Sequence, residues 1–373
     1  MAEAANEGST LAEAVPGPGA SAGDAAQRIR PPKIHPLLRY VLVRIGISIL
    51  LIWGVTIVTF LLTNLVPTDP VAAILGDRAA ADPEIVAQTR ERLGLDQPLI
   101  VQYFTYLGNL LQGDLGVSNQ TRTPVLDSIG QVFPASIELG IGAILISVIL
   151  GLLLGLLSAL KQNTILDHAI RTLSLIGISA PTFWIATVGY FVFFFKLRVV
   201  PGAGRLDPWI TPPPKVTGLY TVDALLSGQM ATFTNALGHL VLPSCVLALF
   251  TIGLLTRFSR SSVLDVIRLD YVTAAKAKGL PTGTVVFKYI FRGALVPIIT
   301  VVGLAFGSLL SGAVLTETVF AWNGIGQYAF RGATTLDLPV IMGVGLVIGI
   351  VYILVNFIVD LIYGFVDPRV RVR

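Results

Sequence analysis

Charged side chains are scarce in this chain of 373 residues. Asp, Glu, Lys and Arg make up 13% of it, whereas soluble domains carry about 25%. Hydrophobic residues make up 54%, and a chain this apolar is difficult to keep in water, which argues against a large soluble protein. The net charge of +4 comes from basic residues beside apolar runs, where membrane topology explains them, so we expect no nucleic-acid partner.

Residue clusters for metal, cofactor or catalytic chemistry are also lacking. The chain has one cysteine, Cys245, which cannot form an internal disulfide bond, and its histidines lie far apart in the sequence. No Cys/His cluster predicts a metal site, and no His-Glu-x-x-His helix is present. No Gly-Lys dipeptide is present, so there is no P-loop for a nucleotide. We expect no catalytic residue, metal or cofactor in this chain, and no enzymatic activity.

Long apolar runs are what the sequence does contain. About 20 apolar residues cross the hydrocarbon core as a helix, and a helix is required because lipid offers the backbone no hydrogen-bond partners. Six such runs predict an all-α membrane protein with six transmembrane helices. They cover roughly residues 40–65, 135–160, 170–195, 237–255, 294–315 and 340–365.

The distribution of basic residues predicts the orientation of these spans. Seven Lys and Arg residues lie between Arg257 and Arg292, opposed only by Asp265 and Asp270. Further basic residues precede the first span and follow the last. Basic loops stay in the cytoplasm, so both termini are predicted to be cytoplasmic. The loop 67–133 carries eight acidic residues against four arginines and is predicted to be outside.

These features divide the chain into regions. The first residues are rich in Ala, Gly, Pro and Glu and have little to bury, so we expect them to be disordered. The predicted regions are a cytoplasmic tail at 1–34, a first transmembrane helix at 35–66, an extracytoplasmic helical domain at 67–133, a five-helix transmembrane core at 134–366 with a basic cytoplasmic loop at 257–292, and a cytoplasmic tail at 367–373.

The outer loop after the first span contains two predicted helices. Asp82 and Pro83 are typical of a helix start, and Gly94 of its end. A second helix is predicted from Pro98 until Gly113. Its apolar residues cover too broad a face for a solvated helix, so we expect it to pack on the membrane domain or to lie in the membrane interface.

A short helix with a sharp end is predicted in the basic cytoplasmic loop, over residues 270–278. Asp270 suits the positive N-terminal end of a helix. Gly279 can adopt the left-handed conformation that ends a helix, and Pro281 prevents continuation. Ala274 and Ala275 add little bulk, so another protein could approach the helix closely. By composition alone, a basic helix resting on anionic lipid is an equal alternative.

Residues 273–279 resemble the Glu-Ala-Ala loop of permease subunits of ABC importers, in the dipeptide, oligopeptide and nickel branch. Thr273 stands where the wider family has Glu, and Arg292 where it has Pro. Other segments resemble the same branch in the same order. They are 92–98, 113–118, 180–184, 255–262, 317–326 and 367–371.

The resemblance implies the transmembrane translocation subunit of an ATP-driven importer in the bacterial cytoplasmic (inner) membrane. Such a subunit would move di- or oligopeptides inward by alternating access, with nickel or another small solute as the alternative cargo. It implies three kinds of partner besides the lipid bilayer: a second homologous permease, two ATPase subunits holding ATP and Mg²⁺, and an extracytoplasmic substrate-binding protein. The coupling residues implied are Tyr271, Thr273, Ala274, Ala275, Lys278 and Gly279.

Other candidate residues follow from the family-like outer segments and from polar groups in spans. Asp114, Gly116, Glu317 and Trp322 are candidates for the binding-protein or gate region, with loop anchoring an equal alternative for Glu317. Asn64 and Asn356 are candidates for the pathway, because polar groups in spans are costly.

Three expectations concern the remaining residues and the competing mechanism. Glu138 and Asp360 lie near span ends, which favours solvation or a structural pair. Phe183 and Trp184 are expected to pack a helix kinked by Pro181. An ion-coupled secondary transporter would predict inverted repeats and buried carboxylates at span centres, and the sequence shows no clear sign of either.

Overall fold

The computed structural model describes residues 36–65, 71, 75, 82–92 and 94–366. Regular structure in these residues is helical, with a single isolated β-bridge and no strand. The expectation of an all-α membrane protein is confirmed. The tails predicted at 1–34 and 367–373 lie outside the described residues. Four described helices are long and apolar enough to cross a membrane, and two bent helix pairs bring the candidate spans to as many as six.

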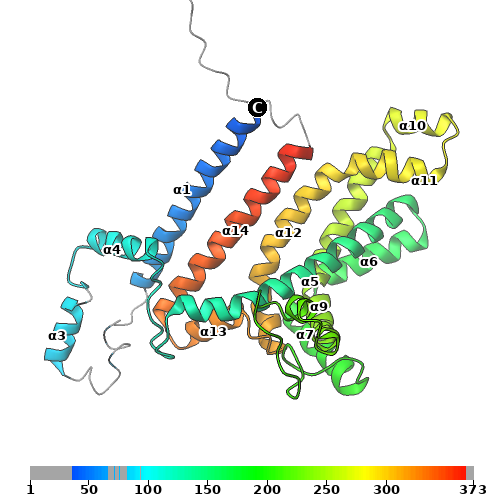
Figure 1. Cartoon of the computed structure of the whole chain (residues 1–373). Coiled ribbons are helices and arrows are strands. Elements are labelled where there is room, and N and C mark those ends of the chain that lie inside the picture. Colours follow the sequence, from blue (N-terminus) through cyan, green and yellow to red (C-terminus); the bar gives the residue numbers. More distant parts are fainter. Residues whose placement is uncertain (1–35, 66–70, 72–74, 76–81, 93, 367–373) are drawn as a thin grey trace, which may run out of the picture.

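The four long helices form a bundle (Figure 1). The figure shows α14 between α1 and α12, and the start of α1 at the same end of the bundle as the end of α14 and the short helix α10. Helices α3 and α13 lie at the other end. The long helices are α1 (Pro36–Leu65), α5 (Val125–Leu160), α9 (Met230–Ile267) and α14 (Leu338–Val366).

The third predicted span, residues 170–195, is not a straight helix. Helix α6 (Ile165–Ser179) meets α7 (Thr182–Tyr190) and the π-helical η1 (Phe191–Lys196) at an angle of 102°. Ala180 is extended because the ring of the following proline disfavours helical geometry there. The predicted kink is confirmed.

The aromatic residues after this kink do not pack as predicted. The side chains of Phe183 and Trp184 are both more than half exposed. The expectation that they fill the kink within the chain is therefore wrong. Beyond Pro181, α7 turns these two rings outward, where lipid or another protein chain can contact them.

The fifth predicted span also begins with a bend. The short α11 (Thr282–Thr284) and the π-helical η2 (Val285–Phe291) lead into α12 (Arg292–Val319). The helix axis turns by 55° at the break before Pro297. The proline lacks the N–H that would continue the hydrogen-bond ladder, which accounts for a bend at this position.

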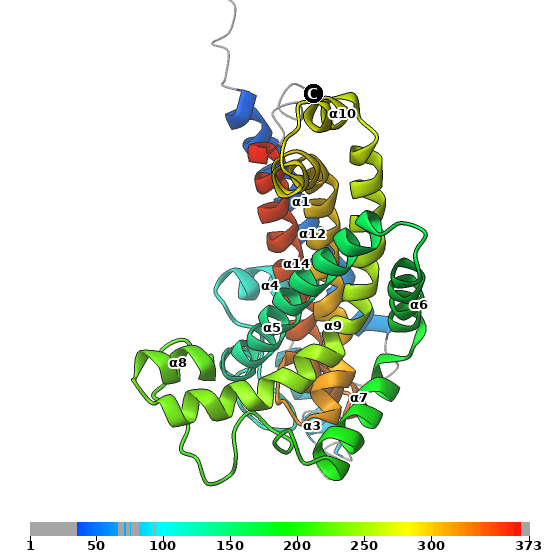
Figure 2. The same cartoon turned by 90° about the vertical axis from the view of Figure 1, so that its right-hand side faces the viewer.

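Helices α5 and α9 approach closely through small residues. A Cβ atom added at Gly151 would lie 2.6 Å from Leu255 Cβ, and one added at Gly155 would lie 2.6 Å from Ser259 Cβ. Small residues at such a contact favour helix association in membranes. Helix α9 also contacts α6, α7 and α12, and Figure 2 shows its first turns projecting to one side with α8 (Tyr220–Leu226). It is therefore a central attachment for the bundle.

The close contact at Gly155 gives a direct test of this packing. We expect Gly155→Ala to lower the free energy of unfolding by about 1–3 kcal/mol, because the new methyl group overlaps Ser259. Thermal unfolding in detergent measures the effect. Gly130→Ala is the matched control, since it lies on the same helix with no atom within 4 Å of an added Cβ. Equal stability of the two variants would contradict the packing.

The predicted outer helix at Asp82 is present as α3 (Pro83–Arg92). The carboxylate of Asp82 accepts a hydrogen bond from the Glu84 N–H at 3.0 Å, as expected for a residue that caps a helix. Gly94 has a φ of 66° and follows the last turn. The signals for the start and the end of this helix are therefore both confirmed.

The second outer helix, α4 (Leu99–Leu111), packs on the first span. The hydroxyl groups of Tyr103 and Thr56 lie 2.8 Å apart in a hydrogen bond, and the rings of Tyr103 and Phe60 meet edge to face. Gly113 has a φ of 81° and follows the helix end. Tyr103 thus attaches α4 to α1, as predicted, while other apolar residues of α4, among them Ile100 and Phe104, stay exposed.

Candidate functional site

Helix α10 (Asp270–Ala277) forms in the basic loop where a short helix is predicted. Leu269 is extended, with φ −77° and ψ 145°, so the chain leaves the direction of α9 before α10 begins. Asp270 lies in the first turn and Lys276 in the last, where each charge is favourable to the helix dipole. The start and the direction of this helix are therefore set by local interactions.

Gly279 ends α10 in the predicted manner. Its φ of 72° lies in the left-handed region, which favours glycine. Its N–H donates to the carbonyl of Lys276 at 2.9 Å, and the N–H of Leu280 donates to the carbonyl of Ala275 at 3.4 Å. Leu280 completes this Schellman arrangement by packing on buried apolar residues. Pro281 follows and prevents continuation.

One face of α10 is held against the bundle. Val272 and Ala275 are buried, and positions three residues apart lie on the same face of a helix. They belong to a buried apolar cluster that joins α10 to α5, α9, η2 and α12, which we call the elbow core. Its residues are Leu156, Ala159, Val263, Val266, Val272, Ala275, Val285, Val286, Ile290, Ala294 and Ile298.

Ala275 does not lie on the outer surface of α10. It is 3% exposed and faces the elbow core, so the expectation that its side chain contributes to an outward small-residue face is wrong. Helical periodicity explains this, because position 275 shares a face with the buried Val272. The other candidate coupling residues are exposed: Tyr271, Thr273, Ala274, Lys278 and Gly279.

Tyr271 connects α10 to the start of α12. Its hydroxyl lies 3.5 Å from the carbonyl oxygen of Tyr289. A Cβ atom added at Gly293 would lie 2.5 Å from the same hydroxyl, so the absence of a side chain there makes room for the tyrosine. The Tyr271 ring also remains partly exposed, and it can therefore contact both the bundle and an external surface.

The surroundings of α10 are strongly basic. Five Lys and Arg side chains near it in the sequence are exposed, and none forms an ion pair within the described residues. The loop that contains α10 therefore carries a net positive charge, opposed only by the exposed Asp265 and Asp270. The five residues are Arg268, Lys276, Lys278, Lys288 and Arg292.

At the other end of the bundle, Glu317 anchors α13 (Ile325–Thr334). Its side chain is fully buried and accepts hydrogen bonds from the Ser136 hydroxyl at 2.5 Å and the Gln327 N–H at 2.8 Å. Side chains at Gly324 would overlap the Glu317 carboxylate. The structure thus favours the loop-anchoring interpretation of Glu317.

Trp322 makes a second connection between the same elements. It is 1% exposed, and its indole N–H donates to the carbonyl of Ala135 at 2.8 Å. The N–H of Ile325 donates to the Ser136 hydroxyl at 2.8 Å. Residues 320–324 and the start of α13 are therefore fixed to α5. Sequence reasoning missed Ser136, because a single serine in an apolar span has no distinguishing pattern.

Asp114 and Gly116 lie in a turn that reaches the start of α14. The Asp114 carboxylate accepts from the Gly116 N–H at 2.8 Å, and Gly116 has a φ of 82°. A Cβ atom at Gly116 would lie 3.4 Å from Pro339. The nearby Ser118 hydroxyl donates to the Asp337 carboxylate at 2.6 Å. We call residues 113–124, 320–324 and α13 the outer cap.

The outer cap brings three sequence-distant segments together. Leu115 of the first segment and Tyr328 of α13 pack on one buried cluster that also contains Val125, Ile325 and Val340. Asp114, Gly116 and Trp322 are therefore parts of the outer cap, and Glu317 of α12 holds α13 of the cap in place. Helix α5 begins at Val125, before the boundary predicted at residue 134.

Two charged residues near span ends form structural pairs, as predicted. Arg205 Nη2 lies 2.7 Å from Glu138 Oε2, and Arg44 Nη2 lies 2.9 Å from Asp360 Oδ1. Glu138 Oε1 also accepts from the N–H and the hydroxyl of Thr221, both at 2.7 Å. Glu138 thereby attaches the outer loop that follows η1 to α5, a contact that no local sequence pattern marks.

A second carboxylate orders the same outer loop. Asp223 of α8 is buried and accepts hydrogen bonds from the N–H groups of Val216, Thr217 and Gly218. Burial acts to raise the pKa of this carboxyl, but the hydrogen bonds hold the pKa of Asp223 below its usual range. The charged form therefore holds the turn together at neutral pH.

The structure does not bring the two pathway candidates together. The Asn356 side chain donates to the Tyr352 carbonyl at 2.9 Å, within its own helix. Asn64 belongs to the last turn of α1, and its side chain lies outside the described part of the chain. Their assignment to a pathway stays a prediction.

Taken with the sequence profile of a known family, this architecture defines a membrane component of a transport system. Residues 151–372 match the family described as binding-protein-dependent transport system inner membrane component, and residues 37–140 match the N-terminal region of such membrane components. The chain belongs to this family. It is therefore a multi-pass inner-membrane permease component rather than a catalytic subunit.

Similar proteins cover nearly the whole chain. A probable D,D-dipeptide transport system permease protein of Escherichia coli is 46% identical over 86% of this chain and 94% of its own length. A di/tripeptide transport system permease protein of Pseudomonas aeruginosa is 43% identical over 90% of this chain and 99% of its own length. A dipeptide transport system permease protein of Alkalihalophilus pseudofirmus is 40% identical over 90% of this chain and 100% of its own length.

Proposed function

We propose that this chain is the translocation subunit of an ATP-driven importer for di- or oligopeptides. The cargo follows from the relatives, which are named as permeases for dipeptides and tripeptides. The observation that carries the mechanism is the two-sided character of α10. One face is buried in the elbow core, while the other is exposed, small and basic.

A close-packed contact transmits movement because it cannot be compressed. Displacement of α10 acts on α9 and η2 through Val272 and Ala275, and on the start of α12 through Tyr271. Helix α9 in turn contacts α5 and α6, and α12 contacts α14. A rigid-body movement of α10 therefore reaches most of the bundle, which is the requirement for switching between outward and inward access.

We assign the exposed residues of α10 to contact with an ATPase subunit. Tyr271, Thr273, Ala274, Lys278 and Gly279 form this contact surface, and Ala275 transmits the movement from inside. The positive charge around them favours an acidic receiving surface. ATP and Mg²⁺ are held by two ATPase subunits, and hydrolysis takes place there. A second homologous permease completes the membrane part.

The outer cap is assigned to the side that meets the substrate-binding protein. Glu317 and Trp322 hold this layer in place from beneath, and the exposed Asp114 with Gly116 shapes its surface. The basic loop with α10 lies at the bundle end that also holds the start of α1 and the end of α14 (Figure 1). The positive-inside rule supports the assignment of this end, and hence of both termini, to the cytoplasm.

Uptake by the assembled transporter in vesicles tests the proposed cargo. We expect labelled di- and tripeptides to accumulate inside vesicles whose ATPase subunits face inward. Accumulation should require ATP inside the vesicles and the binding protein outside them. Radioactive nickel, offered under the same conditions, is the matched control for the alternative cargo. Nickel uptake without peptide uptake would contradict the assignment, as would uptake by the isolated chain driven by an ion gradient.

A further inference from the structure

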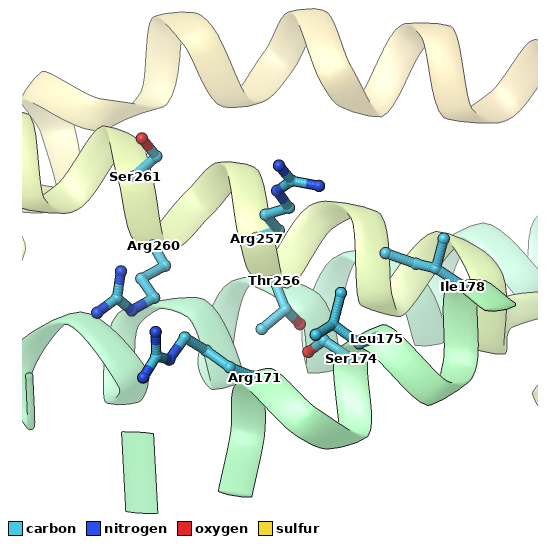
Figure 3. A pocket seen from close by; sticks show the side chains of 8 residues that line it. All are labelled: Arg171, Ser174, Leu175, Ile178, Thr256, Arg257, Arg260 and Ser261. Atoms are coloured by element: carbon cyan, nitrogen blue, oxygen red, sulfur yellow. The ribbon is translucent and has the colours of Figure 1, made fainter. Parts of the chain in front are cut away.

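A pocket of about 300 Å³ lies between α6 and α9 (Figure 3). The two helices are in close contact further along, where a Cβ atom at Gly253 would lie 2.5 Å from the Ser174 carbonyl oxygen. The pocket extends from there toward the end of α9 that precedes α10. Arg260, on its wall, lies about two turns before that end. The pocket is thus near one edge of the apolar part of the bundle.

The pocket carries an excess of positive charge. Three of its lining residues are arginines: Arg171, Arg257 and Arg260. Arg260 is paired with the buried carboxylate of Asp167, with Nε and Nη2 at 2.8 and 2.9 Å from its oxygens. Asp167 also accepts from the Ser158 hydroxyl at 2.5 Å. One carboxylate is therefore shared by Arg260 and, at a longer distance of 3.6 Å, by Arg171, so three guanidinium groups face a single anion and the pocket keeps a net positive charge.

The two remaining arginines differ in their partners. Arg171 Nε lies 3.6 Å from Asp167 Oδ1, and its Nη2 lies 2.6 Å from the ring of His168. Arg257 is exposed and has no hydrogen bond or ion pair within the described residues. Figure 3 shows the Arg257 side chain extending away from Arg171, but no partner holds it there, so it can turn toward an anion beside Arg171 without breaking the pair between Arg260 and Asp167.

Polarity changes along the pocket. Figure 3 shows Arg171 and Arg260 close together at one end, and Ile178 with Leu175 toward the other. Thr256 lies between them; it is 1% exposed, and its hydroxyl has no hydrogen-bond partner in the described structure. A ligand that is anionic at one end, polar in the middle and apolar at the other would satisfy all three parts.

We propose that this pocket binds the headgroup of an anionic phospholipid, with the phosphate at Arg171 and Arg257 and the start of an acyl chain along Leu175 and Ile178. Basic pockets between transmembrane helices near the membrane edge suit such headgroups. The outer face of α6 supports a lipid, because Leu173 and Ile176 are also strongly exposed. A free phosphate would leave the apolar end of the pocket empty.

Retention of phosphatidylglycerol by the assembled transporter tests the proposal. The transporter is washed in detergent with phosphatidylglycerol and phosphatidylcholine, and bound lipids are counted by native mass spectrometry. We expect selective retention of phosphatidylglycerol by the wild type. The double variant Arg171→Gln, Arg257→Gln is expected to bind it at least about tenfold more weakly, since each basic group contributes about a fivefold gain at an anionic surface.

The matched control is the double variant Arg268→Gln, Arg292→Gln. It removes two exposed arginines from the basic loop that contains α10, and neither of them lines the pocket. It is expected to retain phosphatidylglycerol like the wild type. Equal losses in both double variants would reduce the effect to general charge and overturn the proposal. So would displacement of the lipid by millimolar inorganic phosphate, which would indicate a free-phosphate site. Binding by the isolated chain that disappears in the assembled transporter would assign the pocket to a partner subunit.

Discussion

Replacement of Gly279 by valine is expected to separate ATP hydrolysis from uptake in the assembled transporter. At a φ of 72°, a β-branched residue costs about 1–2 kcal/mol or more. The chain relieves this cost by leaving the left-handed conformation. The hydrogen bond from Leu280 to the Ala275 carbonyl is then lost, and Leu280 withdraws from the elbow core.

The consequence for transport follows from the position of these residues. A helix whose end is no longer fixed can rotate on the bundle when an ATPase subunit moves it, so less of the movement reaches α9 and α12. We expect the rate of uptake per ATP hydrolysed to fall by about tenfold, which corresponds to about 1.4 kcal/mol. Parallel measurements of phosphate release and peptide uptake in vesicles determine this ratio.

Gly283→Val provides the matched control for this variant. Gly283 lies four residues further on in α11, has an ordinary backbone conformation, and has no atom within 4 Å of an added Cβ. It is therefore expected to retain the wild-type ratio. A Gly279→Val transporter that inserts in the membrane and couples normally would exclude α10 as the element that transmits movement.

Breaking the pair between Glu138 and Arg205 is expected to have the largest effect on stability. The two side chains are 5% and 11% exposed and lie 2.7 Å apart. Removal of one partner leaves the other charge buried and uncompensated, at a cost of about 3–5 kcal/mol. Arg205 also donates to the Gly218 carbonyl and stacks on the Tyr220 ring, so its loss releases the outer loop from α5.

A double-mutant cycle separates the pair from its surroundings. We expect Arg205→Met and Glu138→Leu each to lower the melting temperature strongly, and the double variant to recover part of that loss, because no buried charge is then left alone. Lys215→Ala is the control, since it removes an exposed cation from the same loop. Additive losses in the double variant would show that the two charges do not interact.

Features with a local cause could be predicted from the sequence. Gly279 ends α10 because glycine tolerates the left-handed conformation, and Asp82 caps α3 because its short carboxylate reaches a nearby N–H. Pro181 breaks the third span for an equally local reason. The size of that bend, 102°, was not predictable, because it depends on how α6 and α7 pack against other helices.

Features that depend on contacts between distant residues could not be predicted. Ala274 and Ala275 are adjacent and chemically identical, yet one faces outward and the other faces the elbow core. Glu317 had two equal interpretations until Ser136, 181 positions away, was found at its carboxylate. The pocket between α6 and α9 likewise combines arginines from two helices that no sequence motif connects.

The sequence by itself determined that this is an all-α membrane protein, where the short helices α3 and α10 begin and end, and that a short basic helix lies between two spans. These properties follow from apolar length, charge distribution and backbone preferences, which act within a few residues. The tertiary structure alone decided which face of α10 is available to a partner, which carboxylates are buried in pairs, and how the outer cap is assembled. Those properties arise from close packing between helices, and packing depends on residues that are neighbours only after the chain has folded.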